Sequence, residues 1–439
     1  MKTELNRLND VSRREFMLRT AKTALGVSLL PVGSSLVRAA GTAATAGTTG
    51  PGTPGFGKAK HVIFLWMNGG MTHIDTWDPK DGATKGPTDP IKAESGSGNM
   101  DRLGGTMTKM AKVANKFSII RSMSSKTGVH DQGTYVMKTG YEPRGTIVHP
   151  GMGAWGSHFL GRIKGVTLPD SVVVNSGNAY PGAGFFPTTT SPIPISNPES
   201  GLQNIKPTTS DDQFKKRISL MDEFDTSFRK KFQSEEVKSY SEFYDETMKL
   251  MKSEDLKAFD LAQEPAAVRE KYGRNNFGQG ALLARRLVQA GVRFVEVQFG
   301  GWDMHNTIDT AMGNTGAIMD NVFATLIEDL QSNGLLDSTM IVMGSEFGRT
   351  PDINENDGRD HYPLAYSTVF AGGGVKGGFV YGSTDKEGRR VADKQVTPQD
   401  FCATIGHGMG LPVDEVVMSP SNRPFTVGDK GVPVTDIFA

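Results

Sequence analysis

Histidines paired with acidic residues are the groups in this sequence best suited to metal binding or acid–base catalysis. Eight histidines occur in 439 residues, and four of them lie next to an acid or two residues from one. The groups are His73 with Asp75, His130 with Asp131, Asp303 with His305, and Asp360 with His361. Imidazole and carboxylate groups are typical ligands of Zn²⁺ and related cations, and they also transfer protons near neutral pH. This pairing predicts a metal site.

Short apolar runs precede most of these groups and are typical of buried parallel strands. The runs cover 61–67, 117–121, 292–299 and 341–343. In open α/β sheets the carboxyl ends of the strands form the edge where ligands bind. We therefore expect the histidine–acid groups to converge at one edge of a sheet.

The stretch 341–375 holds the densest set of charged residues at such a strand end. Glu346 and Arg349 follow the apolar run, a polar loop closes on Arg359, Asp360 and His361, and a second apolar run ends at three glycines. A guanidinium can bind two oxygens of an anionic ester at once. The stretch therefore predicts the centre of a site, with Arg349 and Arg359 as candidate anion clamps.

Apolar runs alternate with helical patterns along most of the chain. This alternation predicts an α/β fold, a three-layer sandwich with a mostly parallel central sheet. We expect one domain over residues 58–439. Within it, the Pro/Thr-rich part of 180–210 predicts an irregular insertion, and the interleaved charges of 210–272 predict a solvated helical layer.

The N-terminal segment resembles an export signal. Arg13-Arg14 precedes a short apolar run and then Ala39, an order that predicts a twin-arginine signal peptide over residues 1–39. A Gly/Ala/Thr-rich flexible linker is expected over 40–57. These features predict export through the twin-arginine machinery to the periplasm or the extracellular space, without a stable membrane span. The formal net charge of zero gives no indication of nucleic-acid binding, and the single Cys402 excludes an intramolecular disulfide.

Several motifs together resemble the DUF1501 family, a group of twin-arginine-exported bacterial proteins in the alkaline phosphatase/sulfatase-like superfamily. They are Asp303-x-His305, Gly344-Ser345-Glu346-Phe347-Gly348-Arg349-Thr350-Pro351, Gly358-Arg359-Asp360-His361-x-Pro363, Gly69-Gly70 with Asp75-Thr76, Arg121-Ser122-Met123-Ser124 with His130-Asp131, and Phe277-Gly278-Gln279-Gly280. The resemblance covers nearly all of residues 58–437. It implies an alkaline phosphatase-like fold with Asp303, His305 and His361 around a metal ion.

The chain departs from the superfamily pattern at three positions. Phe347 follows Glu346 where the resemblance implies an Asp-His pair, and Asn68 stands where an acid ends the first strand, so Asp75 would have to reach in. His130 occupies the place of the nucleophile, and the sulfatase Cys-x-Pro-x-Arg pattern is absent. Three reactions stay open: attack by His130, attack by a nearby hydroxyl, or attack by a metal-activated water, which we favour. The hydroxyl candidates are Ser124, Ser125 and Thr127.

Two functions are consistent with these residues. The first is an exported metal-dependent hydrolase of phosphate or sulfate esters, with polysaccharide-linked esters as one substrate class and Zn²⁺ as the expected ion ahead of Ca²⁺, Mg²⁺ or Mn²⁺. The second is a catalytically degenerate relative that serves as an extracytoplasmic binding or assembly protein. The candidate metal ligands are Asp303, His305, Glu346, His361, Asp75 and His73. The candidate catalytic residues are His130, Asp131, Arg349, Arg359 and Asp360.

Overall fold

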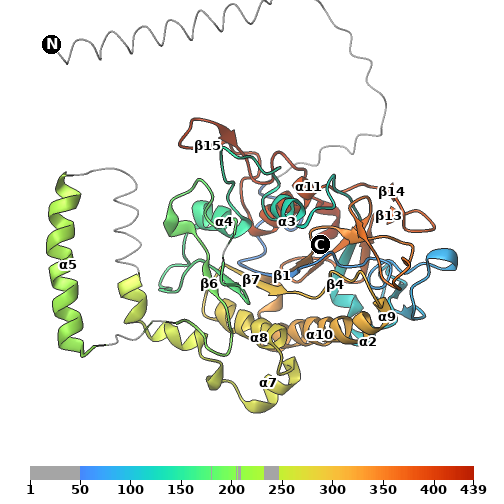
Figure 1. The fold of residues 1–439 in the computed structure, drawn as a ribbon, viewed down its shortest axis with the longest axis horizontal. Coiled ribbons are helices and arrows are strands. Elements are labelled where there is room, and N and C mark those ends of the chain that lie inside the picture. Colours follow the sequence, from blue (N-terminus) through green and yellow to red (C-terminus); the bar gives the residue numbers. More distant parts are fainter. Residues whose placement is uncertain (1–49, 179, 204, 206–208, 232–246) are drawn as a thin grey trace, which may run out of the picture. The chain divides into compact units, whose positions relative to one another are not determined.

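The computed structural model describes residues 50–178, 180–203, 205, 209–231 and 247–439. Within them an eight-stranded sheet forms the centre of the fold (Figure 1). Its order is β12 (Phe379–Tyr381), β4 (Phe117–Met123), β11 (Tyr366–Ala371), β8 (Thr339–Gly344), β1 (His61–Met67), β7 (Phe294–Phe299), β5 (Ser171–Val174) and β6 (Ile193–Ile195). Neighbouring strands pair in parallel, except that β11 runs antiparallel to both β4 and β8.

The first strand, β1, lies near the middle of the sheet and is buried along its whole length. It pairs in parallel with β7 and β8, so that Val62 lies opposite Phe294 on one side and Met340 on the other. All seven of its residues are buried. A strand covered on both faces needs apolar side chains in both directions, which explains why this run does not alternate with polar residues.

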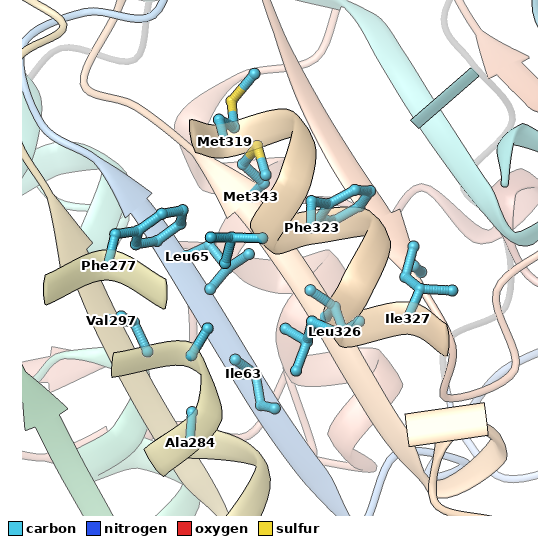
Figure 2. Close-up of a cluster of buried hydrophobic side chains, with 14 of the residues drawn as sticks. Ile63, Leu65, Phe277, Ala284, Val297, Met319, Phe323, Leu326, Ile327 and Met343 are labelled. Atoms are coloured by element: carbon cyan, nitrogen blue, oxygen red, sulfur yellow. The ribbon is translucent and has the colours of Figure 1, made fainter. Parts of the chain in front are cut away.

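Two long helices cover one face of the sheet. These are α8 (Asn276–Gln289) and α10 (Ala317–Ser332), and Figure 2 shows their apolar side chains over β1, β7 and β8. Ile63 and Leu65 of β1 point into this cluster, and both are fully buried. Burial of a side chain of this size contributes about 1.5–3 kcal/mol, so the cluster is a main source of stability.

The other face packs against α3 (His130–Thr139), α4 (Met152–Leu160) and α11 (Pro398–Met409), which lie across the sheet from α8 and α10 in Figure 1. Phe64 and Trp66 of β1 belong to this second cluster, because successive side chains of a strand point to opposite faces. The predicted three-layer α/β sandwich with a mostly parallel sheet is therefore confirmed.

Shorter elements surround these layers. The helices are α2 (Thr108–Lys112), α5 (Asp211–Lys231), α7 (Ala266–Tyr272) and α9 (Ile308–Ala311). The two-stranded pairs are β2 (Ile91–Lys92) with β3 (Arg102–Leu103), β9 (Gly348–Arg349) with β10 (His361–Tyr362), β13 (Ser383–Thr384) with β14 (Val391–Asp393), and β15 (Val417–Met418) with β16 (Pro424–Phe425).

One strand direction differs from the expectation for the stretch 341–375. Because β11 is antiparallel, its first residue, Tyr366, lies at the edge where β1, β7 and β8 end. His361, five residues earlier, stays near that edge. Gly372, at the far end of β11, lies instead beside the start of β8, where an added Cβ would meet the Thr339 carbonyl. The three glycines are thus remote from the site that they were expected to line.

The terminal and inserted segments are described only in part. The predicted signal peptide 1–39 and residues 40–49 lie outside the described residues. At the end of the predicted linker, the Gly57 N–H donates to the His407 carbonyl at 3.1 Å, so contacts with the domain begin before Lys58. The insertion contains β6, which adds a parallel strand to β5. In the described part of the chain, no helix has the length and apolar character to cross a membrane.

Candidate metal centre

Four side chains from one loop, one short strand and one helix meet at the carboxyl edge of the sheet. Asp303 and His305 follow β7, His361 stands in the short β10 before β11, and His130 is the first residue of α3. Since β4, β7 and β8 all run parallel, their following segments emerge at one edge. The convergence predicted from the strand ends is therefore found for these four residues.

The distances within this group are short. Nε2 of His305 lies 3.0 Å from Nε2 of His361, and Oδ1 of Asp303 lies 3.0 Å from the first nitrogen and 3.1 Å from the second. Oδ2 of Asp303 lies 3.4 Å from Nε2 of His130. Ligand atoms of His130, Asp303 and His361 all fall within 4.8 Å of one another, a spacing suited to a metal ion.

Each imidazole is held through its other ring nitrogen. Nδ1 of His130 lies 2.7 Å from Oε1 of Glu346, and Nδ1 of His305 lies 3.0 Å from Oδ1 of Asp360. Nδ1 of His361 lies 2.7 Å from the Gly128 carbonyl oxygen. Because carbonyl and carboxylate oxygens accept, all three Nδ1 atoms donate. In the neutral rings, the Nε2 atoms then carry lone pairs directed at the centre.

This donor set fits a divalent cation. Three imidazole lone pairs and a carboxylate converge, and the donors nearest to them belong to Arg349, whose Nη2 donates to Oδ1 of Asp303 and whose Nη1 lies 3.4 Å from Nε2 of His305. Nε2 of His130 is buried and has no hydrogen-bond partner among the described residues. Tetrahedral ligands about 2.0–2.1 Å from Zn²⁺ lie roughly 3.4 Å apart, and the contacts here span 3.0–3.4 Å. Each ring also has the acceptor behind it that metal-bound histidines usually show.

Arg349 keeps Asp303 ionised from behind. Its guanidinium is fully buried and donates through Nη2 to Oδ1 of Asp303 and to the Gly69 carbonyl. Partial burial alone raises the pKa of the Asp303 carboxyl, but the hydrogen bond and the positive charge of Arg349 act in the opposite direction, and the pKa falls to about 2. Arg349 also donates to the carbonyls of Gly70, at 3.0 Å, and Arg359, at 2.9 Å. Its donors hold the loops together, which leaves no two-point fork for an ester.

Glu346 lies behind His130 rather than among the ligand atoms. It is fully buried, and its Oε1 accepts hydrogen bonds from Nδ1 of His130 and from the Gly69 N–H at 2.8 Å. This placement departs from the ligand role expected from the sequence. A carboxylate fully engaged with buried donors has no oxygen directed at the centre.

Asp75 and Arg359 form a buried ion pair away from the centre. The guanidinium donates through Nε and Nη2 to the two carboxylate oxygens at 2.7 and 2.9 Å, and its Nη1 donates to the carbonyls of Thr350 and Pro351. Both side chains are almost fully buried. Asp75 therefore does not reach the metal centre, and Arg359 is not positioned to bind an ester.

Two further candidates also lie outside the centre. His73 is fully buried, its Nε2 lies 2.9 Å from the Gly388 carbonyl, and burial lowers its pKa. Asp131 lies in the first turn of α3 with its side chain exposed, and it is not part of the His130, Asp303 and His361 group. Adjacency to a functional histidine therefore does not place an acid in the site.

Three residues that sequence reasoning did not assign also shape the centre. The side-chain amide of Asn354 donates to Oδ1 of Asp360 and to the His305 carbonyl, both at 3.1 Å. The Gly128 carbonyl orients His361. The ring of Phe347 is buried, and its centroid lies 5.0 Å from the centroid of the His130 ring and 4.7 Å from that of the His361 ring. An Asn in a polar loop between paired acids is a weak signal for such a role, and the carbonyl and the ring offer none.

Comparison with solved structures finds sulfatases and alkaline phosphatases. The PsFucS1 sulfatase from Pseudoalteromonas sp. is 13% identical with a TM-score of 0.41, over 87% of this chain and 72% of that one. The lipoteichoic acid synthase LtaP from Listeria monocytogenes is 10% identical with a TM-score of 0.38, over 84% and 76%. The alkaline phosphatase from the Antarctic bacterium TAB5 is 12% identical with a TM-score of 0.33, over 75% and 95%.

A search of curated proteins gave no match. The model of one protein family, described as "Protein of unknown function (DUF1501)", matches residues 59–438. That range contains the sheet, its helical layers and every residue of the candidate metal centre. The chain therefore belongs to the DUF1501 family.

Proposed function

We propose that this chain is a metal-dependent hydrolase of phosphate or sulfate esters. The observation that supports the proposal is the convergence of His130, Asp303, His305 and His361 at the sheet edge. Their side chains are between 27% and 49% exposed, so the centre is open to solvent on one side. Structural zinc sites are usually closed, whereas catalytic sites keep a position open for substrate.

The donor types favour Zn²⁺ over the alternatives. Three imidazoles with one carboxylate suit a borderline cation, while Ca²⁺ and Mg²⁺ prefer oxygen ligands. When bound, such an ion supplies a Lewis acid that stabilises developing charge on an ester oxygen and makes water more nucleophilic near neutral pH. Mn²⁺, Mg²⁺ and Ca²⁺ remain the ions to compare in an assay.

The residues of the chain have separate tasks in the proposed reaction. Asp303, kept ionised by Arg349, contributes negative charge at the centre. His305 and His361 are oriented by Asp360 and by the Gly128 carbonyl, so their Nε2 atoms face inward. Ester cleavage transfers the phosphoryl or sulfuryl group to water and releases the alcohol, which gains a proton that the attacking water gives up. Attack through Nε2 of His130 is the alternative when that nitrogen does not hold the ion.

A hollow whose lining includes none of the four residues of the centre supports a substrate larger than a free ester. It has a volume of about 110 Å³ and is lined mainly by hydroxyl and amide side chains. Its wall includes 124–127, the loop that leads to Gly128 and hence to His361. Uncharged donors and acceptors suit the hydroxyls of a sugar, so we include polysaccharide-linked esters among the substrates. The lining residues are Ser124, Ser125, Lys126, Thr127, Val136, Glu142, Gln395, Thr397, Pro398 and Gln399.

We also propose that the protein acts in the periplasm or outside the cell. Arg13-Arg14 and the apolar run before Ala39 support export through the twin-arginine machinery. The test is to replace both arginines by lysine and to follow the protein by cell fractionation. The wild-type chain should appear shortened outside the cytoplasm, and the variant should stay inside at full length. Export of the variant to the same extent would contradict this part of the proposal.

The decisive experiment joins metal analysis to turnover. The full chain is purified after export, its metal content is measured by mass spectrometry, and 4-nitrophenyl phosphate, bis(4-nitrophenyl) phosphate and 4-nitrophenyl sulfate are tested. We expect turnover of at least one ester that a chelator abolishes, that Zn²⁺ restores, and that His305→Ala lacks. A metal-loaded protein that turns over no ester would contradict the hydrolase and favour the binding or assembly protein.

A further inference from the structure

The carboxylate of Glu346 is fully buried and contacts His130 on the side of the ring that faces away from the candidate metal centre. We propose that Glu346 is a positioning residue, which acts through His130 and does not ligate the ion. It holds the His130 ring in the rotamer and tautomer that direct Nε2 at Asp303. This inference rests on the proposed metal centre, and it assigns the charge of Glu346 to a specific partner.

The contacts of Glu346 leave it no freedom to bind an ion. Oε1 accepts from Nδ1 of His130 at 2.7 Å and from the Gly69 N–H at 2.8 Å, while Oε2 lies 3.0 Å from the Ser345 hydroxyl. The residue is 0% exposed. Oε1 is therefore held by the ring that faces the centre, while Oε2 shares the single Ser345 hydroxyl proton with the Met67 carbonyl, 2.6 Å from the same hydroxyl.

Close packing around Glu346 fixes this arrangement. A Cβ added at Gly133, one turn along α3 from His130, would lie 3.0 Å from the Glu346 Cβ and 3.1 Å from the Phe347 ring. The same Phe347 ring lies against His130. The helix can approach the strand end this closely because residue 133 has no side chain, and the approach brings Nδ1 within reach of the carboxylate.

The hydrogen bond has a chemical consequence at the far side of the ring. With Nδ1 protonated toward Glu346, Nε2 keeps its lone pair, and a carboxylate behind an imidazole strengthens it as a ligand. Nε2 of His130 is buried without a hydrogen-bond partner among the described residues, 3.4 Å from Oδ2 of Asp303. A buried acceptor without a donor is costly. A cation at the centre would remove that cost.

The test compares two substitutions of Glu346 in the full chain. Glu346→Gln keeps an acceptor for Nδ1 but loses the charge, whereas Glu346→Ala loses both. After removal of bound metal, Zn²⁺ affinity is measured by titration calorimetry, and the Co²⁺-loaded protein is examined by visible absorption. We expect a weakening of about 10-fold for Gln and nearer 100-fold for Ala, the range typical of lost outer partners. The Co²⁺ bands should change as His130 leaves the ligand set.

A matched control separates positioning from stability. Asp78 is also a buried carboxylate, paired with Lys80 at 2.9 Å and Arg121 at 3.6 Å, away from the centre. Asp78→Asn should destabilise the fold and leave both Zn²⁺ affinity and the Co²⁺ spectrum unchanged. If Glu346 acts through His130, Glu346→Gln should weaken Zn²⁺ binding no further once His130→Ala is present.

The outcomes distinguish this inference from the function on which it rests. A wild-type chain that binds no divalent ion overturns the metal centre and the inference together. A wild-type chain that binds Zn²⁺ while Glu346→Gln keeps both its affinity and its Co²⁺ spectrum overturns the inference alone. Additive losses in the Glu346→Gln, His130→Ala double variant would also overturn it. The Gln variant preserves the shape of the side chain, so the test remains available if the Ala variant does not fold.

Discussion

Two aspartates that follow strands of the same sheet each pair with a buried arginine, and the two pairs differ in how fully the arginine matches the carboxylate. Asp75 and Arg359 form a buried two-point ion pair with the remaining Nη1 donor on backbone carbonyls. Asp303 is about half exposed and faces His305 and His361, whose nitrogens have no proton to offer it in the neutral form. Both groups were candidates for the site, and of the two only the second includes a buried acceptor without a hydrogen-bond partner among the described residues, Nε2 of His130.

The difference shows what turns a charged strand end into a binding centre. In a buried pair the ionic and hydrogen-bonding capacity is used within the fold, so it fixes loops and has nothing left for a ligand. Around Asp303 the surrounding groups hold each ring from behind. The inner nitrogen of His130 has no hydrogen-bond partner among the described residues, while that of His305 lies 3.4 Å from Nη1 of Arg349. A binding centre therefore needs acceptors that orient each imidazole through Nδ1 and leave Nε2 available for a ligand.

Removal of one member of the buried pair should have the largest effect on stability. Arg359→Met leaves the Asp75 carboxylate buried without its partner, and we expect a loss of about 3–5 kcal/mol in the free energy of unfolding. Urea unfolding followed by circular dichroism measures it. Because the pair lies outside the centre, Zn²⁺ affinity of the folded variant should stay the same. A large loss of Zn²⁺ affinity without loss of stability would mean that the two groups have been assigned the wrong way round.

Removal of a metal ligand should lower Zn²⁺ affinity strongly and change the stability of the metal-free protein little. His361→Ala takes away an imidazole that faces Asp303 at 3.1 Å, and we expect Zn²⁺ affinity to fall by more than the 10–100-fold typical of an outer partner. The metal-free variant should unfold within about 1 kcal/mol of the metal-free wild type, because the ring is partly exposed. Calorimetric titration and urea unfolding of metal-free protein give both values. Unchanged affinity would remove His361 from the centre.

Loss of an exposed outer partner should give a smaller effect. Asp360→Asn keeps an oxygen for Nδ1 of His305 but removes the charge, and the side chain is 57% exposed. We expect a fall in Zn²⁺ affinity of about 10-fold, the lower end of the usual range for such partners. In the same titration, Asp360→Asn should lose less Zn²⁺ affinity than Glu346→Ala. An Asp360 variant that loses more than the buried Glu346 variant would contradict the dependence on burial.

Substitution of the acid next to His130 should have the smallest effect. Asp131 is exposed in the first turn of α3, and Asp131→Asn should change the free energy of unfolding by no more than about 0.5 kcal/mol. Zn²⁺ affinity and ester turnover should match the wild type. A tenfold loss of turnover would show that Asp131 moves into the centre when substrate binds.

Much of the architecture could be predicted because burial leaves a local pattern. The apolar runs correspond to β1, β4, β7 and β8. The direction of β11 could not be predicted, because a run of buried residues has the same apolar pattern whether the strand is parallel or antiparallel to its neighbours. Its antiparallel pairing moved Gly372 away from the site while His361 stayed beside it.

The candidate site was predictable for Asp303, His305 and His361, and less so for His73, the other acids and the arginines. His305 and His361 lie where the strand ends placed them, together with Asp303 and His130. Glu346, Arg349 and Arg359 have long side chains that reach either toward a ligand or back into the protein. Which way each one turns depends on the donors and acceptors that other loops bring to it.

Asp303, His305 and His361 of this protein's candidate centre follow from the sequence, because apolar runs specify strands and parallel strands deliver their ends to one edge. Glu346, Asp75 and His73 were expected with them and lie outside it. The pairing of those residues depends on the folded chain. Glu346 meets His130 across 216 positions, and Arg359 meets Asp75 across 284. Hydrogen-bond partners depend on distance and burial in the folded chain, so the residues next to a side chain in sequence do not predict them. For that reason Glu346, which was expected to bind a metal ion, instead accepts a hydrogen bond from His130. Arg359, which was expected to bind an ester, instead pairs with the buried Asp75.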